Sequence, residues 1–139
     1  MTFREYLKEA EWLNEQILEI LDKANLMRNN LYGRAVNYEN GGTTSGSSAD
    51  DALGKALAKI MDFEKSADVL IDQLVEKKIV IEKHILKLTD VKLRRILEKK
   101  YLLFESNEKI AADLKYSVNH VYKLKNQAIR IIEEVWIQN

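Results

Sequence analysis

The side chains best suited to binding chemistry form a basic run near the C-terminus. Between Lys115 and Ile132 every charged residue is a cation, whereas acidic and basic residues alternate closely in the rest of the chain. These cations are Lys115, Lys123, Lys125 and Arg130. A helical face that carries only positive and neutral polar groups suits a polyanion. The run therefore favours nucleic-acid binding, and the alternative is a solvated basic face without a partner.

Catalytic or metal chemistry finds little support in the sequence. His84 and His120 are the only histidines, they fall in different predicted helices, and His120 has no acidic residue three or four positions away in its own helix. Cysteine is absent, which excludes disulfides, thiolate metal ligands and cysteine nucleophiles. No glycine-rich phosphate loop or serine catalytic motif is present. We therefore predict no enzyme, no catalytic residues, no metal site and no cofactor.

The basic run lies in a segment, 106–132, that predicts a helix-turn-helix. Ser106 and Ser117 are suited to N-cap two short helices, and Lys115-Tyr116-Ser117 forms the turn between them. The predicted inner positions follow helical spacing; they are Ile110, Ala111, Leu114, Val121, Leu124, Ala128 and Ile131. Lys115 stands where glycine is usual, and a left-handed lysine costs about 1 kcal/mol. The alternative is an ordinary helical hairpin without a DNA-binding role.

Two long helices are predicted before this segment, over 1–32 and 51–88. Each carries apolar residues at alternating spacings of three and four, which is typical of a coiled-coil seam. The first seam is Tyr6, Ala10, Leu13, Ile17, Ile20, Ala24, Met27 and Leu31. The second is Ala56, Ile60, Phe63, Ala67, Leu70 and Leu74, resuming at Ile81, Ile85 and Leu88 after Lys77 and Lys78. Residues 33–50, rich in Gly, Ser, Thr and Asn, are predicted to be a flexible polar linker.

Together these patterns predict an all-α protein with a long antiparallel helical hairpin and a C-terminal helix-turn-helix domain at 89–139. An additional helix over 91–104 completes the core of that domain. An intermolecular coiled coil is the alternative to the hairpin, so a homodimer through the long helices stays open. Residues 90–139 hold ten Lys or Arg and seven Asp or Glu, so the basic excess lies in the half with the helix-turn-helix.

The chain has 139 residues, with no proline and five glycines, so long helices are permitted almost everywhere. No apolar run approaches the length that spans a membrane, and the charged start of the sequence is unlike a signal peptide. The lack of cysteine suits a reducing compartment, and we expect a cytoplasmic protein without a membrane partner.

The C-terminal fifty residues resemble region four of bacterial sigma factors, which reads the upstream promoter element. The matching segments are RRILEKKYLLF, SNEKIAADLKYS and VNHVYKLKNQAIRII. The whole chain is similar to small regulators of Gram-positive phages and prophages, of the ArpU type, some of which are described as late-gene transcription regulators. The specific part is confined to about Leu93–Ile132, and Lys115 in place of glycine is the main departure. A promoter-melting region has no counterpart, so the resemblance implies a promoter-binding activator or auxiliary factor.

The resemblance also implies roles for individual residues in binding promoter-like double-stranded DNA. Those placed to approach base edges are Ser117, Val118, Asn119, Tyr122, Lys123 and Asn126. Those suited to phosphate contacts are Arg94, Arg95, Lys115, Lys125 and Arg130. An Asn pairs with adenine and a Lys with guanine, and each good contact contributes roughly 1–3 kcal/mol of discrimination.

The long helices would then join two copies or dock on RNA polymerase or a second regulator, inside a bacterial host cell. Two other classes of function stay open. The first is a non-enzymatic interaction protein whose hairpin contacts another protein. The second is a DNA-packaging subunit, which also combines DNA-binding helices with coiled coils.

Overall fold

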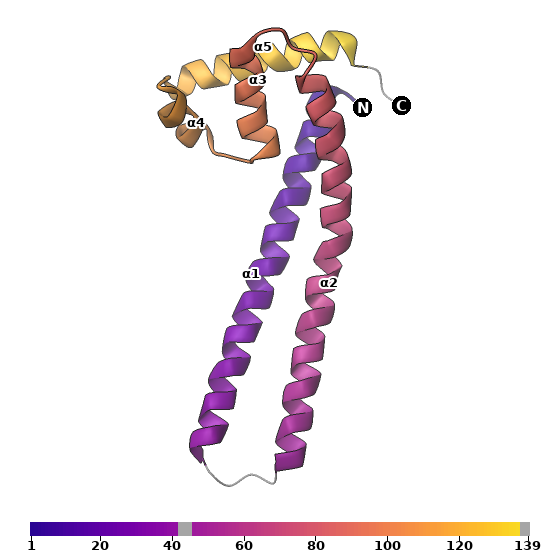
Figure 1. The fold of residues 1–139 in the computed structure, drawn as a ribbon, viewed down its shortest axis with the longest axis vertical. Coiled ribbons are helices and arrows are strands. Elements are labelled where there is room, and N and C mark those ends of the chain that lie inside the picture. The colour runs from indigo at the N-terminus through magenta and orange to yellow at the C-terminus, as the bar shows by residue number, and fades with distance from the viewer. Residues whose placement is uncertain (42–45, 137–139) are drawn as a thin grey trace. The chain divides into compact units, whose positions relative to one another are not determined.

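A computed structural model describes residues 1–41 and 46–136, with the side chains of residues 34–50 left out. Over this part of the chain the fold is all-α, which confirms the predicted fold class (Figure 1). The helices are α1 (Phe3–Gly41), α2 (Gly46–Ile85), α3 (Val91–Leu97), the π-helical segment η1 (Glu98–Leu102), α4 (Asn107–Leu114) and α5 (Val118–Val135). The chain divides into two compact units, one of Met1–Leu13 with Gln73–Asn139, the other of Asn14–Asp72.

The unit of residues 14–72 is a helical hairpin in which α1 and α2 run side by side in opposite directions. Its fully buried seam consists of Ile17 and Ala24 on α1 and Ile60 and Ala67 on α2, spaced by seven residues on each helix. This spacing is the coiled-coil repeat that the sequence predicts. An ion pair between Arg28 and Glu64 joins the two helices beside the seam.

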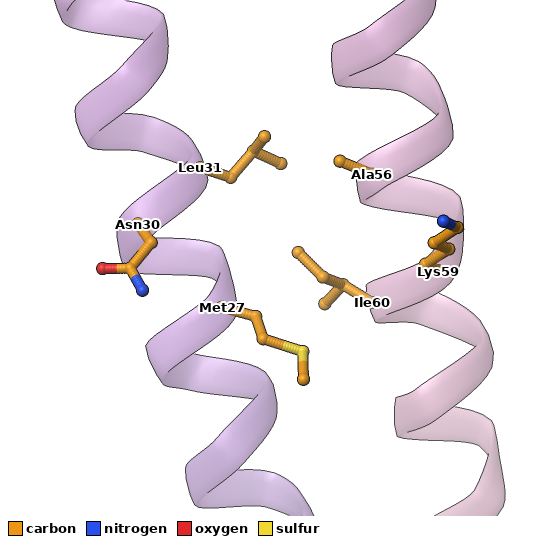
Figure 2. Close-up of a pocket in the computed structure, with 6 residues that line it drawn as sticks. All are labelled: Met27, Asn30, Leu31, Ala56, Lys59 and Ile60. Carbon is orange, nitrogen blue, oxygen red and sulfur yellow. The ribbon is translucent and has the colours of Figure 1, made fainter.

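The predicted seam fails at one position of this hairpin. Met27 stays 44% exposed, because the facing side chains do not fill the space between the helices at its level. Met27 and Leu31 of α1 line a pocket of about 280 Å³ together with Ala56 and Ile60 of α2 (Figure 2). The seam is therefore not packed as a continuous core at this level.

Both long helices extend into the segment predicted as a linker. α1 continues through Gly41 and α2 begins at Gly46, so of the predicted linker 33–50 only residues 42–45 lie outside the described residues. The predicted boundary at residue 33 is wrong, because α1 continues through Gly33. A glycine within a helix costs only about 1 kcal/mol, and the chain has no proline to stop the helix outright.

The other unit contains the two chain segments that flank this hairpin in sequence. Its core includes Phe3, Leu7, Ala10 and Leu13 of α1, together with Leu74, Ile81 and Ile85 of α2 and Leu88 beyond it. Tyr6, predicted in the seam, is only half-buried, and the seam passes through Phe3 and Leu7 instead.

Lys77 and Lys78, which interrupt the predicted seam of α2, each cover an aromatic ring. The Lys77 ammonium lies 4.2 Å from the centroid of the Tyr6 ring and 2.7 Å from the Glu9 carboxylate. The Lys78 ammonium lies 5.0 Å from the centroid of the Phe104 ring. The methylene stems of the lysines replace apolar side chains at these positions while the cations interact with the rings.

The helix predicted over 91–104 changes from α-helical to π-helical hydrogen bonding after Leu97. Asp90 caps α3 by accepting a hydrogen bond from the Lys92 amide at 2.9 Å, and α3 gives way to η1 after Leu97. The Leu103 amide donates to the Glu98 carbonyl five residues earlier, at 3.1 Å. The wider π turn still buries Tyr101, and the segment closes at Phe104 with a positive φ of 53°.

Candidate nucleic-acid interface

Helices α4 and α5 form the predicted helix-turn-helix, and each begins at a capping serine. The Ser106 hydroxyl accepts a hydrogen bond from the Lys109 amide at 3.2 Å. The Ser117 hydroxyl accepts one from the His120 amide at 3.1 Å. Both hydroxyls satisfy amides that have no partner inside their own helix, so the sequence correctly predicts where α4 and α5 begin.

The turn is closed by Lys115 in the left-handed conformation, with φ 59° and ψ 43°. The amides of Lys115 and Tyr116 both donate to the Ala111 carbonyl, the latter at 2.9 Å. This is the geometry of a Schellman-type helix end, in which glycine is the usual residue. The lysine thus adopts the strained conformation that the sequence predicts, and the turn fixes the angle at which α5 leaves α4.

A small apolar core holds α3, α4 and α5 together. Ile96, Ile110, Ala111 and Val121 are buried in it. The partly buried Leu114, Tyr116 and Leu124 pack against this cluster. Five of these seven residues are at positions predicted as inner, so the crossing of α4 and α5 is as the sequence pattern indicates.

The inner face of α5 differs from the prediction near its C-terminal half. Ile131 is 41% exposed, and Ile129 and Ile132 are buried instead, together with Val121 and Ala128. The predicted stripe assumed contact with α4 alone. In the structure α5 also packs against the first turns of α1, and this second neighbour shifts the buried arc by about one residue.

The first turns of α5 present the residues proposed to read bases. Ser117, Val118, Asn119, Tyr122 and Lys123 are all exposed. With about 100° of rotation per residue, Asn119 and Lys123 lie roughly opposite the buried stripe, and so do His120, Gln127 and Arg130. His120 and Gln127 were missed as contact candidates, although the buried stripe of α5 could have identified them as its opposite face.

Asn126 is placed differently from the other predicted base-reading residues. It is half-buried, and its side-chain oxygen accepts a hydrogen bond from Arg4 Nη1 at 3.4 Å. The Arg4 amide also donates to Glu133 Oε1 at 2.8 Å, so the start of α1 lies along this flank of α5. Asn126 therefore belongs to the internal packing of this unit.

An aromatic cluster continues the same contact to the end of α5. The Trp136 ring lies 4.7 to 5.3 Å from the rings of Phe3, Tyr6 and His84, measured between centroids. Its indole N–H donates to the Met1 carbonyl at 2.9 Å. These contacts attach α5 to the ends of α1 and α2, which gives the exposed face of α5 a rigid support.

The five cations predicted to contact phosphate divide into two groups. Arg95, Lys115 and Arg130 are exposed and free to approach a polyanion. Arg94 is half-buried, and its Nε has no hydrogen-bond partner among the described residues. Lys125 is half-buried with its ammonium 4.7 Å from the centroid of the Tyr122 ring, and burial, with a smaller contribution from Lys100, lowers the pKa of its amine.

A small pocket beside the turn includes Lys92, which is not one of these five cations. Lys92 and Arg95 of α3 line it with Leu114 and Tyr116. Tyr116 also packs edge-on against His120, with their ring centroids 4.8 Å apart. Lys92 and Arg95 therefore lie near the turn that leads into the exposed face of α5.

Other functional chemistry is not apparent in the part of the chain that the structure describes. Among residues 1–33 and 51–136, whose side chains the structure describes, no cluster of three His, Asp or Glu side chains is arranged to hold a metal ion. None of the helices in these ranges carries an apolar stretch of the length that crossing a membrane requires. Comparisons with protein-family models, curated proteins and solved structures found no match to this chain.

Proposed function

We propose that this protein is a transcription regulator that binds promoter-like double-stranded DNA through α5. The observation that carries the proposal is the α4–turn–α5 geometry, in which two serine caps and the left-handed Lys115 present a helix face that has no acidic residue from Val118 to Ile132. The second helix of such a motif enters the major groove with its first turns against base edges. Asn119 and Lys123 are then the reading residues, with His120 and Gln127 beside them.

Phosphate contacts in this proposal come from cations on both sides of the reading face. Lys92, Arg95 and Lys115 lie near the start of α5, and Arg130 lies two turns beyond Lys123. They supply affinity that falls with salt, but little discrimination between sequences. Lys125 and Arg94 are not included among the proposed phosphate contacts, because both are half-buried.

The resemblance to region four of sigma factors and to phage regulators of the ArpU type supports a promoter as the target. It also supports RNA polymerase as a second partner and the cytoplasm of a bacterial host as the place of action. An interaction protein or a packaging subunit is the competing proposal, and the exposed apolar side chains of the hairpin are what favours it.

Selection of bound sequences from a random duplex library tests the proposal. We expect the unaltered protein to enrich one motif, and Asn119→Ala or Lys123→Ala to relax the preference at single positions of that motif by roughly 1–3 kcal/mol. Arg130→Ala should instead weaken binding to all duplexes alike and reduce its salt dependence.

Asn29→Ala and Lys65→Ala are matched controls, since they remove an asparagine and a lysine side chain from exposed positions of the hairpin. Both should leave the motif and the affinity unchanged. A folded protein that enriches no motif would contradict the proposal and favour the interaction protein. Particles of ring-like mass would favour the packaging subunit.

A further inference from the structure

The hairpin of residues 14–72 buries one apolar stripe and leaves a second one open to solvent. Leu18 and Tyr32 of α1 and Leu57, Met61 and Ile71 of α2 are between 37% and 58% exposed. Single exposed apolar residues are ordinary on protein surfaces, whereas several on one face of an element are typical of an interaction site.

These side chains lie on one face of the hairpin, as the seven-residue repeat shows. On α1, Leu18, Asn25 and Tyr32 each follow a seam position by one residue. On α2, Leu57, Glu64 and Ile71 repeat at seven-residue intervals beside the seam, and Met61 and Asp68 lie next to them. The Arg28–Glu64 ion pair crosses between the helices beside these residues, so both stripes are on the same side. The ion-pair face is then Leu18, Leu21, Asn25, Arg28, Tyr32, Leu57, Met61, Glu64, Asp68 and Ile71.

The opposite face of the same hairpin has a different composition. Its residues are Gln16, Glu19, Lys23, Leu26, Asn30, Lys59, Asp62, Ser66 and Val69, of which only Leu26 and Val69 are apolar. Glu19 and Lys23 form an exposed ion pair there. The opposite face of the hairpin thus has the mainly polar composition of a solvent-exposed surface. The ion-pair face has the mixed apolar and charged composition of a protein–protein contact.

The residues of the two helices match level by level along the ion-pair face. Because α1 and α2 run antiparallel and Arg28 pairs with Glu64, Tyr32 lies near the level of Leu57 and Met61. By the same count Asn25 lies level with Asp68, and Leu21 with Ile71. Apolar residues therefore lie opposite apolar residues at the levels of Tyr32 and Leu21, and the Arg28 cation lies opposite the Glu64 carboxylate. At the remaining level the Asn25 amide lies opposite the Asp68 carboxylate.

We propose that two copies of this chain associate through the ion-pair face to form a four-helix bundle. The two-fold axis runs parallel to the helices, so α1 of each copy packs against α2 of the partner subunit. Arg28 of one copy then approaches Glu64 of the partner subunit, and Tyr32 packs between Leu57 and Met61 of the partner subunit. Every pair of neighbouring helices is antiparallel, the usual arrangement of a four-helix bundle.

Charge distinguishes this axis from the alternative one. A two-fold axis perpendicular to the helices, through the middle of the face, would set α2 against α2 and bring Glu64 near Asp68 of the partner subunit. Two facing carboxylates repel each other, whereas the parallel axis pairs opposite charges. The parallel axis also places residues 14 and 72, from which each chain continues to α5, at the same end of the bundle.

Sedimentation equilibrium of the full-length protein without DNA tests this interface independently of the proposed DNA binding. We expect twice the chain mass of 16.1 kDa. Leu18→Lys and Met61→Lys place a cation in the contact and should raise the dissociation constant at least about tenfold. Leu26→Lys and Val69→Lys are matched controls on the opposite face and should leave the dimer intact. Circular dichroism verifies that each variant remains helical.

Cysteine cross-linking tests the axis, since the chain has no cysteine of its own. A mixture of Tyr32→Cys and Met61→Cys proteins, one carrying a tag, should form a mixed disulfide in high yield. A mixture of Met61→Cys and Ile71→Cys should not, because these positions lie roughly 15 Å apart along the bundle. A monomer at all concentrations, equal dissociation by the control variants, or cross-linking only in the second mixture would overturn the proposal.

Discussion

The helix-turn-helix and the hairpin of residues 14–72 differ in how completely their helices bury apolar side chains. Around Ile96, Ile110 and Val121, three helices enclose a core that excludes water, and the outer face of α5 is polar. In the hairpin two helices enclose only one narrow seam, and apolar side chains remain outside it. A closed core with a polar outer face suits a polar ligand such as DNA. An incompletely covered hairpin suits another apolar surface.

Core truncation should show this difference most strongly. Ile110→Ala removes a fully buried side chain from between three helices and should cost about 2–5 kcal/mol of unfolding free energy. Met27→Ala, at a predicted seam position that is 44% exposed, should cost far less. Denaturant unfolding measures both. Equal losses would mean that the hairpin is packed as tightly at Met27 as the helix-turn-helix is at Ile110.

Local sequence rules correctly predicted the parts of the helix-turn-helix that depend on neighbours in sequence. The caps at Ser106 and Ser117 and the left-handed Lys115 follow from the preferences of a few adjacent residues. Asn126 could not be placed in this way, because its partner Arg4 lies 122 positions away and makes α5 pack against a second neighbour. The exchange of Ile131 for Ile132 in the core has the same origin.

The ends of the two long helices and the π-helical segment were also not predictable from sequence patterns. Gly33 was read as a stop, but the cost of one glycine is small beside the cooperative gain of continuing a long helix. The π-helical turn at Glu98–Leu102 buries Tyr101, and residue spacing alone does not reveal such a turn. Residue spacing alone therefore did not predict these two features, whereas the all-α class followed from periodicity.

Alkaline titration should weaken the unit that contains the helix-turn-helix through Tyr101. Burial, with a smaller effect of the Glu11 carboxylate, raises the pKa of the Tyr101 phenol well above its ordinary value of about 10. The folded state therefore keeps the proton more tightly than the unfolded state. The resulting stability is complete below pH 10 and is lost as the pH rises from there toward the folded pKa.

Denaturant unfolding of the unaltered protein and of Tyr101→Phe at pH 8 and pH 11 measures this contribution. We expect the unaltered protein to lose more unfolding free energy between the two pH values than the variant does, because phenylalanine has no proton to release. A loss of equal size in both proteins would show that other groups, such as the lysines, cause the alkaline effect and that Tyr101 does not.

The smallest expected change in unfolding free energy comes from two opposite substitutions. One introduces a glycine in the helix-turn-helix, and the other replaces a glycine in the hairpin. At Lys115, φ of 59° favours glycine, so Lys115→Gly should raise the unfolding free energy by up to about 1 kcal/mol. At Gly54, inside α2, an added Cβ would have no atom within 4 Å, so Gly54→Ala should stabilise by about 0.4–1 kcal/mol. Lys123→Gly is the control within α5 and should destabilise by about 1 kcal/mol. Thermal unfolding of the three variants measures these changes. If the Lys115→Gly protein melts at a lower temperature than the unaltered protein, the lysine side chain stabilises the turn by more than its backbone strain costs.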